Sequence, residues 1–158
     1  MGFAERAVRA CDEAMANGVV TERHARDILK CDHVDVSVIE KHFQSTDSTV
    51  RMLAASIIGQ KGKSIESLLN AAMCEKNVSV LLAMLTELGK RKDGVEKLRQ
   101  FINEDDVIIR DAAIDMFRRA GKPNSLFPLL FDKDDLVVQR IKRYLDEQKG
   151  QTREESRI

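Results

Sequence analysis

The feature that most constrains the fold of this chain is an apolar pattern that recurs at a nearly constant interval. The aliphatic residues that open its four copies stand 30, 29 and 29 residues apart: Val50, Val80, Ile109 and Val138. An Asp or Asn lies three residues before each of them: Asp47, Asn77, Asp106 and Asp135. Self-similarity at a fixed period of this length indicates a chain of stacked supersecondary units.

Each copy has the spacing of an α-helix. Residues 103–117 contain apolar side chains at i, i+3, i+4, i+7 and i+8: Ile109, Ala112, Ala113, Met116 and Phe117. This spacing forms one stripe along a helix, and the acids before it suit a helix N-terminus as cap and as partners of the helix dipole. The stripes of the second and fourth copies are interrupted, because Glu87 and Lys142 occupy stripe positions. We expect a helix of about twelve residues in every copy.

A second, shorter apolar segment lies between these helices. Its copies are 30, 30 and 29 residues apart, at Val38, Leu68, Leu98 and Phe127. Each unit is therefore predicted to be two helices, the first of about ten residues. A pair of this size cannot bury its own apolar face and depends on its neighbours for burial. The prediction is an all-α chain of about four stacked helix pairs, an α-solenoid.

The most regular copies, residues 47–62 and 105–121, resemble the second helix of HEAT-type repeats. They share an Asp, a Val or Ile followed by Arg, an Ala-Ala pair and a Gly, and the other two copies lack the Arg at that position. The resemblance covers roughly residues 34–149. It implies a right-handed α-α superhelix whose second helices line the concave side, and it does not by itself imply an activity.

The two ends of the chain lie outside the repeat. Residues 1–33 are predicted to form two helices, the first ending at Asn17-Gly18, and this pair is expected to cap the apolar end of the first repeat. Residues 150–158 are polar and without pattern, so we expect a flexible tail. The chain is thus predicted to be a single HEAT-like domain over residues 1–149, with the repeats following the cap.

Composition narrows the class of protein. Of the 158 residues, 4% are aromatic and none is Trp, so the core must be built from aliphatic side chains. No apolar run is long enough to span a membrane, and the charged, amphipathic N-terminus is unlike a signal peptide. The three cysteines, an odd number and widely spaced, suit reduced thiols. We therefore expect a cytoplasmic protein without contact to a membrane.

The sequence contains no catalytic or metal-binding pattern. Its histidines and cysteines show no Cys-x-x-Cys or His-x-x-x-His spacing, so no metal is expected. Gly-rich phosphate loops and nucleophile elbows are missing as well. Two enzyme classes with HEAT-like folds lack their residues here: the His-Glu dipeptides of di-iron hydroxylases and the tryptophans of alkylpurine DNA glycosylases. We expect a protein that is not an enzyme and has no cofactor.

The first candidate binding surface is the side of the second helices turned away from their core stripes. If these helices line a concave side, the residues predicted to bind a protein partner are Arg51, Met52, Leu81, Leu82, Leu85, Arg110, Ile114 and Arg140. Three leucines crowd the centre of this set, and an apolar patch rimmed by charge is typical of a protein interface. Packing between repeats that buries at least two of these leucines is the other interpretation, and the sequence leaves both open.

The second candidate surface is a basic edge. The net charge is zero, with 26 basic and 26 acidic residues, but bases cluster after each second helix and acids before it. The residues of this edge that could contact phosphate are Lys61, Lys63, Lys90, Arg91, Lys92, Arg118, Arg119 and Lys122. Nucleic-acid binding is therefore the alternative to protein binding. The same distribution would also arise from helix dipoles alone, without any partner.

Overall fold

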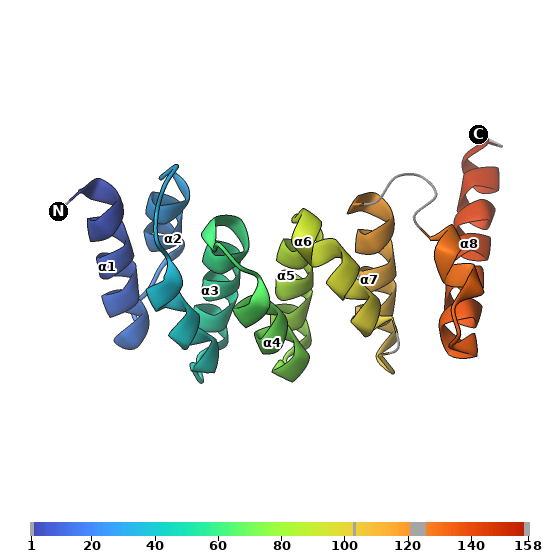
Figure 1. The fold of residues 1–158 in the computed structure, drawn as a ribbon, viewed down its shortest axis with the longest axis horizontal. Coiled ribbons are helices and arrows are strands. Elements are labelled where there is room, and N and C mark those ends of the chain that lie inside the picture. The colour runs from blue at the N-terminus through green and yellow to red at the C-terminus, as the bar shows by residue number, and fades with distance from the viewer. Residues whose placement is uncertain (1, 103, 121–125, 157–158) are drawn as a thin grey trace. The chain divides into compact units, whose positions relative to one another are not determined.

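The structure, a computed structural model, describes residues 2–102, 104–120 and 126–156 (Figure 1). Every regular element in these ranges is helical, and no strand occurs among them. The all-α class expected from the apolar spacing is therefore confirmed for the described part of the chain. None of the helices described is long and apolar enough to cross a membrane.

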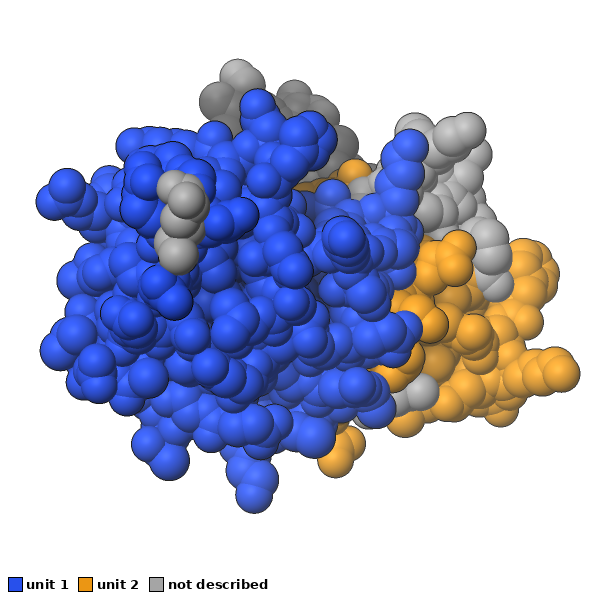
Figure 2. Space-filling model, turned by 60° about the vertical axis from the view of Figure 1, so that its left-hand side comes forward, with its two compact units in different colours: residues 1–94 blue, residues 95–158 orange. Residues whose placement is uncertain are grey.

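The chain divides into two compact units, residues 1–94 and 95–158 (Figure 2). The boundary falls within the first helix of the third predicted repeat. Unit 1 therefore contains the N-terminal pair and two repeats, and unit 2 contains most of the last two. Each unit is described by itself below.

Unit 1 is built in two layers. Its helices are α1 (Phe3–Ala16), α2 (Glu22–Leu29), the 3₁₀-helix η1 (Ser37–Gln44), α3 (Ser48–Lys61), α4 (Glu66–Cys74) and α5 (Val78–Gly89), and the single-turn α6 (Lys92–Val95) follows at the boundary. Helices α2, α3 and α5 lie side by side in that order, and α1, η1 and α4 form the other layer (Figure 1). Each member of the second layer packs on the helix that follows it in sequence, so the core of the unit lies between the layers.

Three of the four predicted N-caps are confirmed. The side-chain oxygens of Asp47, Asn77 and Asp106 accept a backbone N–H from the first turn of α3, α5 and α7, at 2.9, 3.2 and 2.9 Å. The fourth prediction is wrong by one residue. Asp134 accepts the first-turn N–H at 3.0 Å, and Asp135 is already the first residue of its helix. Two adjacent acids are equally good capping types, so the sequence could not separate them.

Three of the four first helices of the repeats are tighter than predicted, whereas the fourth, α4, is an α-helix of nine residues as expected. We expected helices of about ten residues, but η1, η2 (Glu96–Phe101) and η3 (Phe127–Phe131) are 3₁₀-helices, and η3 has only five residues. In η3 a proline, Pro128, lies in the first turn. Proline lacks a backbone donor and limits how a helix can extend, which accounts for the short helix.

The predicted stripes form the core of unit 1. On α3 and α5 every stripe residue is buried or half-buried: Val50, Leu53, Ala54, Ile57, Ile58, Val80, Ala83, Met84 and Leu88. Leu68 and Ala72 of α4 are buried against them. These side chains are all aliphatic except Met84, as the composition required. Burial of each larger side chain contributes roughly 1.5–3 kcal/mol, which makes this stripe the main stabilising feature of the unit.

Unit 2 consists of η2, α7 (Val107–Ala120), η3 and α8 (Asp135–Ser156). Its core is a cluster formed by Ile102, Ile114, Leu126, Leu129, Val137, Ile141 and Tyr144. Helix α8 is longer than the predicted second helix, and it includes residues 150–156, which the sequence assigned to a tail.

The buried face of α7 differs in part from the predicted stripe. Ile109 and Ala113 are buried as expected, whereas the other stripe residues are only half-buried. Ile114, which the sequence placed on the opposite side, has no exposed surface and belongs to the core cluster. The face that α7 buries is therefore turned toward Ile114.

The position of Ala113 provides a test of this register. Ala113 has no exposed surface, so the Ala113→Asp variant places an unpaired carboxylate in the core and should lose about 3 kcal/mol or more of unfolding free energy. Ala112 is only half-buried, and Ala112→Asp makes the same change of helix propensity one residue earlier. In urea titrations followed by far-UV circular dichroism, Ala113→Asp should be much less stable than Ala112→Asp. Equal midpoints for the two variants would show that the buried face of α7 is assigned wrongly.

Candidate binding grooves

Most of the apolar residues predicted to bind a partner are buried. Leu85 and Ile114 have no exposed surface and Leu81 is 5% exposed, whereas Leu82 is half-buried and Met52 is 38% exposed. Of the two interpretations left open, the structure thus shows the one in which packing buries at least two leucines. The physical reason is that apolar side chains cover most of α5, and only its side with Ser79 and Thr86 is exposed. These buried residues are not part of the proposals below.

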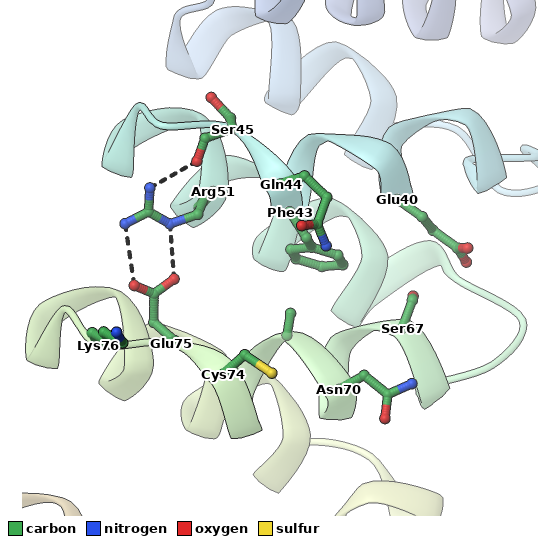
Figure 3. Close-up of a pocket in the computed structure, with 11 residues that line it drawn as sticks. Glu40, Phe43, Gln44, Ser45, Arg51, Ser67, Asn70, Cys74, Glu75 and Lys76 are labelled. Atoms are coloured by element: carbon green, nitrogen blue, oxygen red, sulfur yellow. Dashed lines mark hydrogen bonds and ion pairs between the residues drawn. The ribbon is translucent and has the colours of Figure 1, made fainter.

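Arg51, predicted as a rim residue, is instead used inside unit 1. Its guanidinium donates to both carboxylate oxygens of Glu75, at 2.8 and 3.1 Å, and to the Ser45 carbonyl at 2.8 Å (Figure 3). The Glu75 side chain is 6% exposed. Burial acts to raise the pKa of its carboxyl, but the hydrogen bonds from Arg51 and from backbone N–H groups outweigh burial and hold the pKa below its ordinary value. Arg51 therefore joins α3 to the end of α4.

A groove of about 600 Å³ lies beside this ion pair, between η1 and α4. Its walls are mainly polar, with Gln44 on η1, Asn70 and Cys74 on α4, and the ring of Phe43 between them (Figure 3). Apart from Arg51, no residue of this groove was predicted. Arg51 and Glu75 neutralise each other there, so the groove offers amide and hydroxyl groups for hydrogen bonding and little net charge.

A second groove, of about 270 Å³, lies between α7 and α8 of unit 2. It brings together two of the predicted partner-binding residues, Arg110 and Arg140. Arg140 donates to the Ile102 carbonyl at 2.7 Å, which fixes its direction. Two exposed aliphatic side chains line the same groove, Val107 at 53% and Leu136 at 45% exposure. The groove therefore combines exposed apolar surface with cations, the combination predicted for a protein-binding surface.

A polar network closes the inner side of the α7–α8 groove. The Tyr144 hydroxyl donates to Asp115 Oδ1 at 2.8 Å and accepts from Arg118 Nε at 3.0 Å. Burial and the Asp115 carboxylate raise the pKa of Tyr144, so the phenol stays protonated and remains a donor. Because the network ties α7 to α8, the two walls of the groove are held together.

The three arginines of the predicted basic edge are engaged by their own neighbours. Arg118 and Arg119 both pair with Asp115, at 3.0 and 2.8 Å. Arg91 pairs with Asp93 and donates to the Gly62 carbonyl at 2.6 Å.

The lysines of the edge are more accessible. Lys90 forms a long ion pair of 3.4 Å with Glu87, while Lys63 and Lys92 are exposed and Lys61 is half-buried. Lys122 lies outside the described residues. The arginines of the edge, which would bind phosphate best, are thus engaged within the fold.

No group of three or more His, Cys, Asp or Glu side chains that could hold a metal ion occurs among the described residues. The closest acid–imidazole pair is Asp12 and His42, joined at 2.7 Å, with Lys41 at 3.1 Å from the same carboxylate. This pair links α1 to η1. His42 is buried, which agrees with a structural role in packing the two elements.

Comparisons of the chain with protein families, with curated proteins and with solved structures find no match.

The partners of several polar residues could not be predicted from the sequence. Glu75 was one of the acids before a second helix, and nothing nearby in the chain marks it as the partner of Arg51, 24 residues away. Tyr144 and Asp115 are 29 residues apart. The repeat itself could have indicated such pairs, because residues about one period apart in the sequence lie on adjacent repeats.

The Arg51–Glu75 pair provides a second prediction. Replacing Arg51 by Met leaves a buried carboxylate unpaired and should cost about 3 kcal/mol of unfolding free energy, whereas Arg51→Met combined with Glu75→Leu should recover most of this loss. The pKa of Glu75 is lowered in the fold from 4.5. The stabilisation of the fold by the Arg51–Glu75 pair is therefore complete above about pH 4.5. It is lost as the pH falls through the lower pKa that Glu75 has in the folded state.

Urea denaturation of the parent and the two variants between pH 3 and pH 7 checks both statements. The gap between the parent and the single Arg51→Met variant should narrow at acid pH, because protonation of Glu75 removes the charge that Arg51 stabilises. A single Arg51→Met variant as stable as the parent would mean that the guanidinium does not hold Glu75 in solution.

Proposed function

We propose that this chain is a non-catalytic scaffold or adaptor that binds a protein partner through its second helices. The observation that carries this proposal is the α7–α8 groove. There Arg110 and Arg140 lie beside two aliphatic side chains that are about half exposed. Apolar anchors next to arginine are the combination enriched at the energetic centres of protein interfaces.

The proposal includes the HEAT-like, right-handed superhelix that the sequence resemblance implies. Its support is the recurrence of starting points at one period and the packing of unit 1. In that unit α1, η1 and α4 each pack on the helix that follows in sequence, and α2, α3 and α5 touch in succession. Stacked pairs of this kind expose one side of the second helices as a continuous surface. The cytoplasmic location expected from the cysteines belongs to the same proposal.

The chemistry of the α7–α8 groove favours an acidic, partly apolar partner segment. Three arginines border it, Arg110, Arg140 and Arg143, against two acids, Asp111 and Glu147. Arg143 is paired with Glu147 at 3.3 Å. Among the described residues the Arg110 side chain has no such partner, so it is available to a carboxylate.

The nucleic-acid alternative has less support. Counterion release requires several cations that are free to neutralise phosphates. Arg118 and Arg119 share one carboxylate, and Arg91 is held by Asp93 and a backbone carbonyl. The test below therefore includes a result that would indicate nucleic-acid binding.

The test compares one charge reversal in the groove with a matched reversal outside it. Arg110→Glu and Leu136→Ser should each weaken partner retention at least tenfold in affinity capture from native lysate, because one removes a cation and the other an apolar anchor. Arg119→Glu makes the same charge change on the same helix outside the groove and should leave retention within about twofold.

Retention should also survive nuclease treatment. Each variant is first checked for parental helicity. A partner that is lost with nuclease, or that depends on Arg119 but not on the groove, contradicts the proposal and supports the basic edge.

A further inference from the structure

A third groove, of about 350 Å³, lies in unit 1 between α2 and α3, with α5 at its base. Five apolar side chains line it: Ala25, Leu29, Met52, Leu53 and Ala83. Ser56 and three charged residues complete the lining. Glu22 and Arg26 are on exposed positions of α2, and Glu87 comes from α5.

Glu87 is the unusual member of this set, because it is a buried carboxylate. The residue is 8% exposed. Its Oε1 is 3.4 Å from the ammonium of Lys90, and its Oε2 is buried with no hydrogen-bond partner among the described residues. The amide of Gln60 is close enough to favour the ionised carboxyl, but it donates to Ser56 Oγ at 3.1 Å and makes no hydrogen bond to Oε2. Oε2 is therefore an unused acceptor without exposed surface, and a ligand in the groove reaches it only after the Glu87 side chain rotates.

The fold makes space for this carboxylate at a specific position. Glu87 occupies a stripe position of α5 where the other copies have apolar residues, and it packs on Gly59 of α3. A Cβ at Gly59 would lie 2.6 Å from Glu87 Cβ and 3.1 Å from Oε2, so no other residue fits there without displacing Glu87. Burial raises the pKa of Glu87, and Lys90 and Gln60 offset only part of this effect. A buried carboxylate with one idle oxygen destabilises the free protein, which an apolar residue would not do.

We propose that this groove binds a lysine side chain of a protein partner, with the ammonium group on Glu87 Oε2 and the methylene stem along the apolar walls. Long basic side chains bury their stems on apolar surface in this way. Lysine fits better than arginine because Lys90 already occupies Oε1. A guanidinium fork pairs best with two carboxylate oxygens, whereas an ammonium needs only one.

The other charges around the groove do not cancel the attraction of Glu87. Glu22 and Arg26 are one turn apart on α2, so their opposite charges balance each other locally. The Lys90 side chain is 59% exposed, and its repulsion of an incoming ammonium is screened by water. Glu87 is buried, and an interaction with a buried charge is screened much less.

This site goes beyond the proposed function and does not depend on it. It lies in unit 1 and selects a cation, whereas the α7–α8 groove is in unit 2 and selects an anion. Failure of one leaves the other in place, and the two tests use different variants and different ligands.

The test uses three small probes on the full chain: Nα-acetyl-lysine N-methylamide, its 6-hydroxynorleucine analogue and its norleucine analogue. In ¹H–¹⁵N spectra the lysine probe should give saturable shifts at the backbone amides of Ala25, Ala83 and Glu87. The two uncharged probes should bind at least tenfold more weakly, since they lack the ammonium. Saturation with the lysine probe should also lower the pKa of Glu87, followed through its carboxyl ¹³C shift.

Two variants complete the experiment. Glu87→Gln keeps the shape and removes the charge, so it should weaken the lysine probe at least tenfold. Glu13→Gln removes an exposed carboxylate of α1 outside the groove and should change binding less than about twofold. Absence of saturable shifts, equal binding of the norleucine probe, or unchanged binding to Glu87→Gln would each overturn the proposal. If Glu87→Gln does not fold, the comparison of the three probes on the parent decides alone.

Discussion

The constraint on which the rest of the structure depends is that no helix pair of this chain can bury its apolar stripe by itself. Within unit 1 the stripe of α3 is buried against α2, η1 and α5, and in each unit polar contacts join residues about 30 positions apart. Asp12 meets His42, Arg91 meets the Gly62 carbonyl and Tyr144 meets Asp115, at separations of 30, 29 and 29 residues. These hydrogen bonds join neighbouring pairs at the margins of the apolar layer. Because the stripe fixes which residues come together, each polar contact adds specificity to a packing that hydrophobic burial has already selected.

The parts of the fold that could be predicted are those that follow from local spacing. The stripes and three of the four caps depend on residues within one helical turn or a few turns of one another, and the period of 3.6 is visible in the sequence. The first helices were predicted less well, since η1, η2 and η3 are 3₁₀-helices with too few residues for the spacing to separate the two helix types. The buried side of α7 was also placed imperfectly. Ile108, Ile109 and Ile114 are all aliphatic, and only packing decides that Ile108 is exposed and Ile114 is buried.

The candidate sites were harder to predict, because an exposed and a buried cation look alike in a sequence. Arg51 and Arg110 occupy the same position of two copies, after a Val or an Ile. Arg51 is bound to Glu75, whereas Arg110 lines a groove. The two arginines differ because Arg51 has a carboxylate within reach in the next repeat. A contact over 24 residues cannot be read from the sequence around either arginine. In the same way the leucines of α5 were ambiguous, since apolar residues cover most of that helix and only Ser79 and Thr86 mark its exposed side.

The interruption of the α5 stripe at Glu87 shows how a departure from the pattern can be more informative than the pattern itself. A carboxylate in a core position lowers the stability of the fold unless something offsets it. Lys90 offsets part of that cost through Oε1, and the apolar groove next to Oε2 supplies the remaining element of a cation site. The net charge of zero conceals this arrangement. The α7–α8 groove exposes Arg110, a cation that no described residue neutralises. The groove between α2 and α3 contains Glu87, a buried anion that Lys90 neutralises only in part. Binding selectivity therefore depends on where each charge is desolvated and not on how many charges the chain carries.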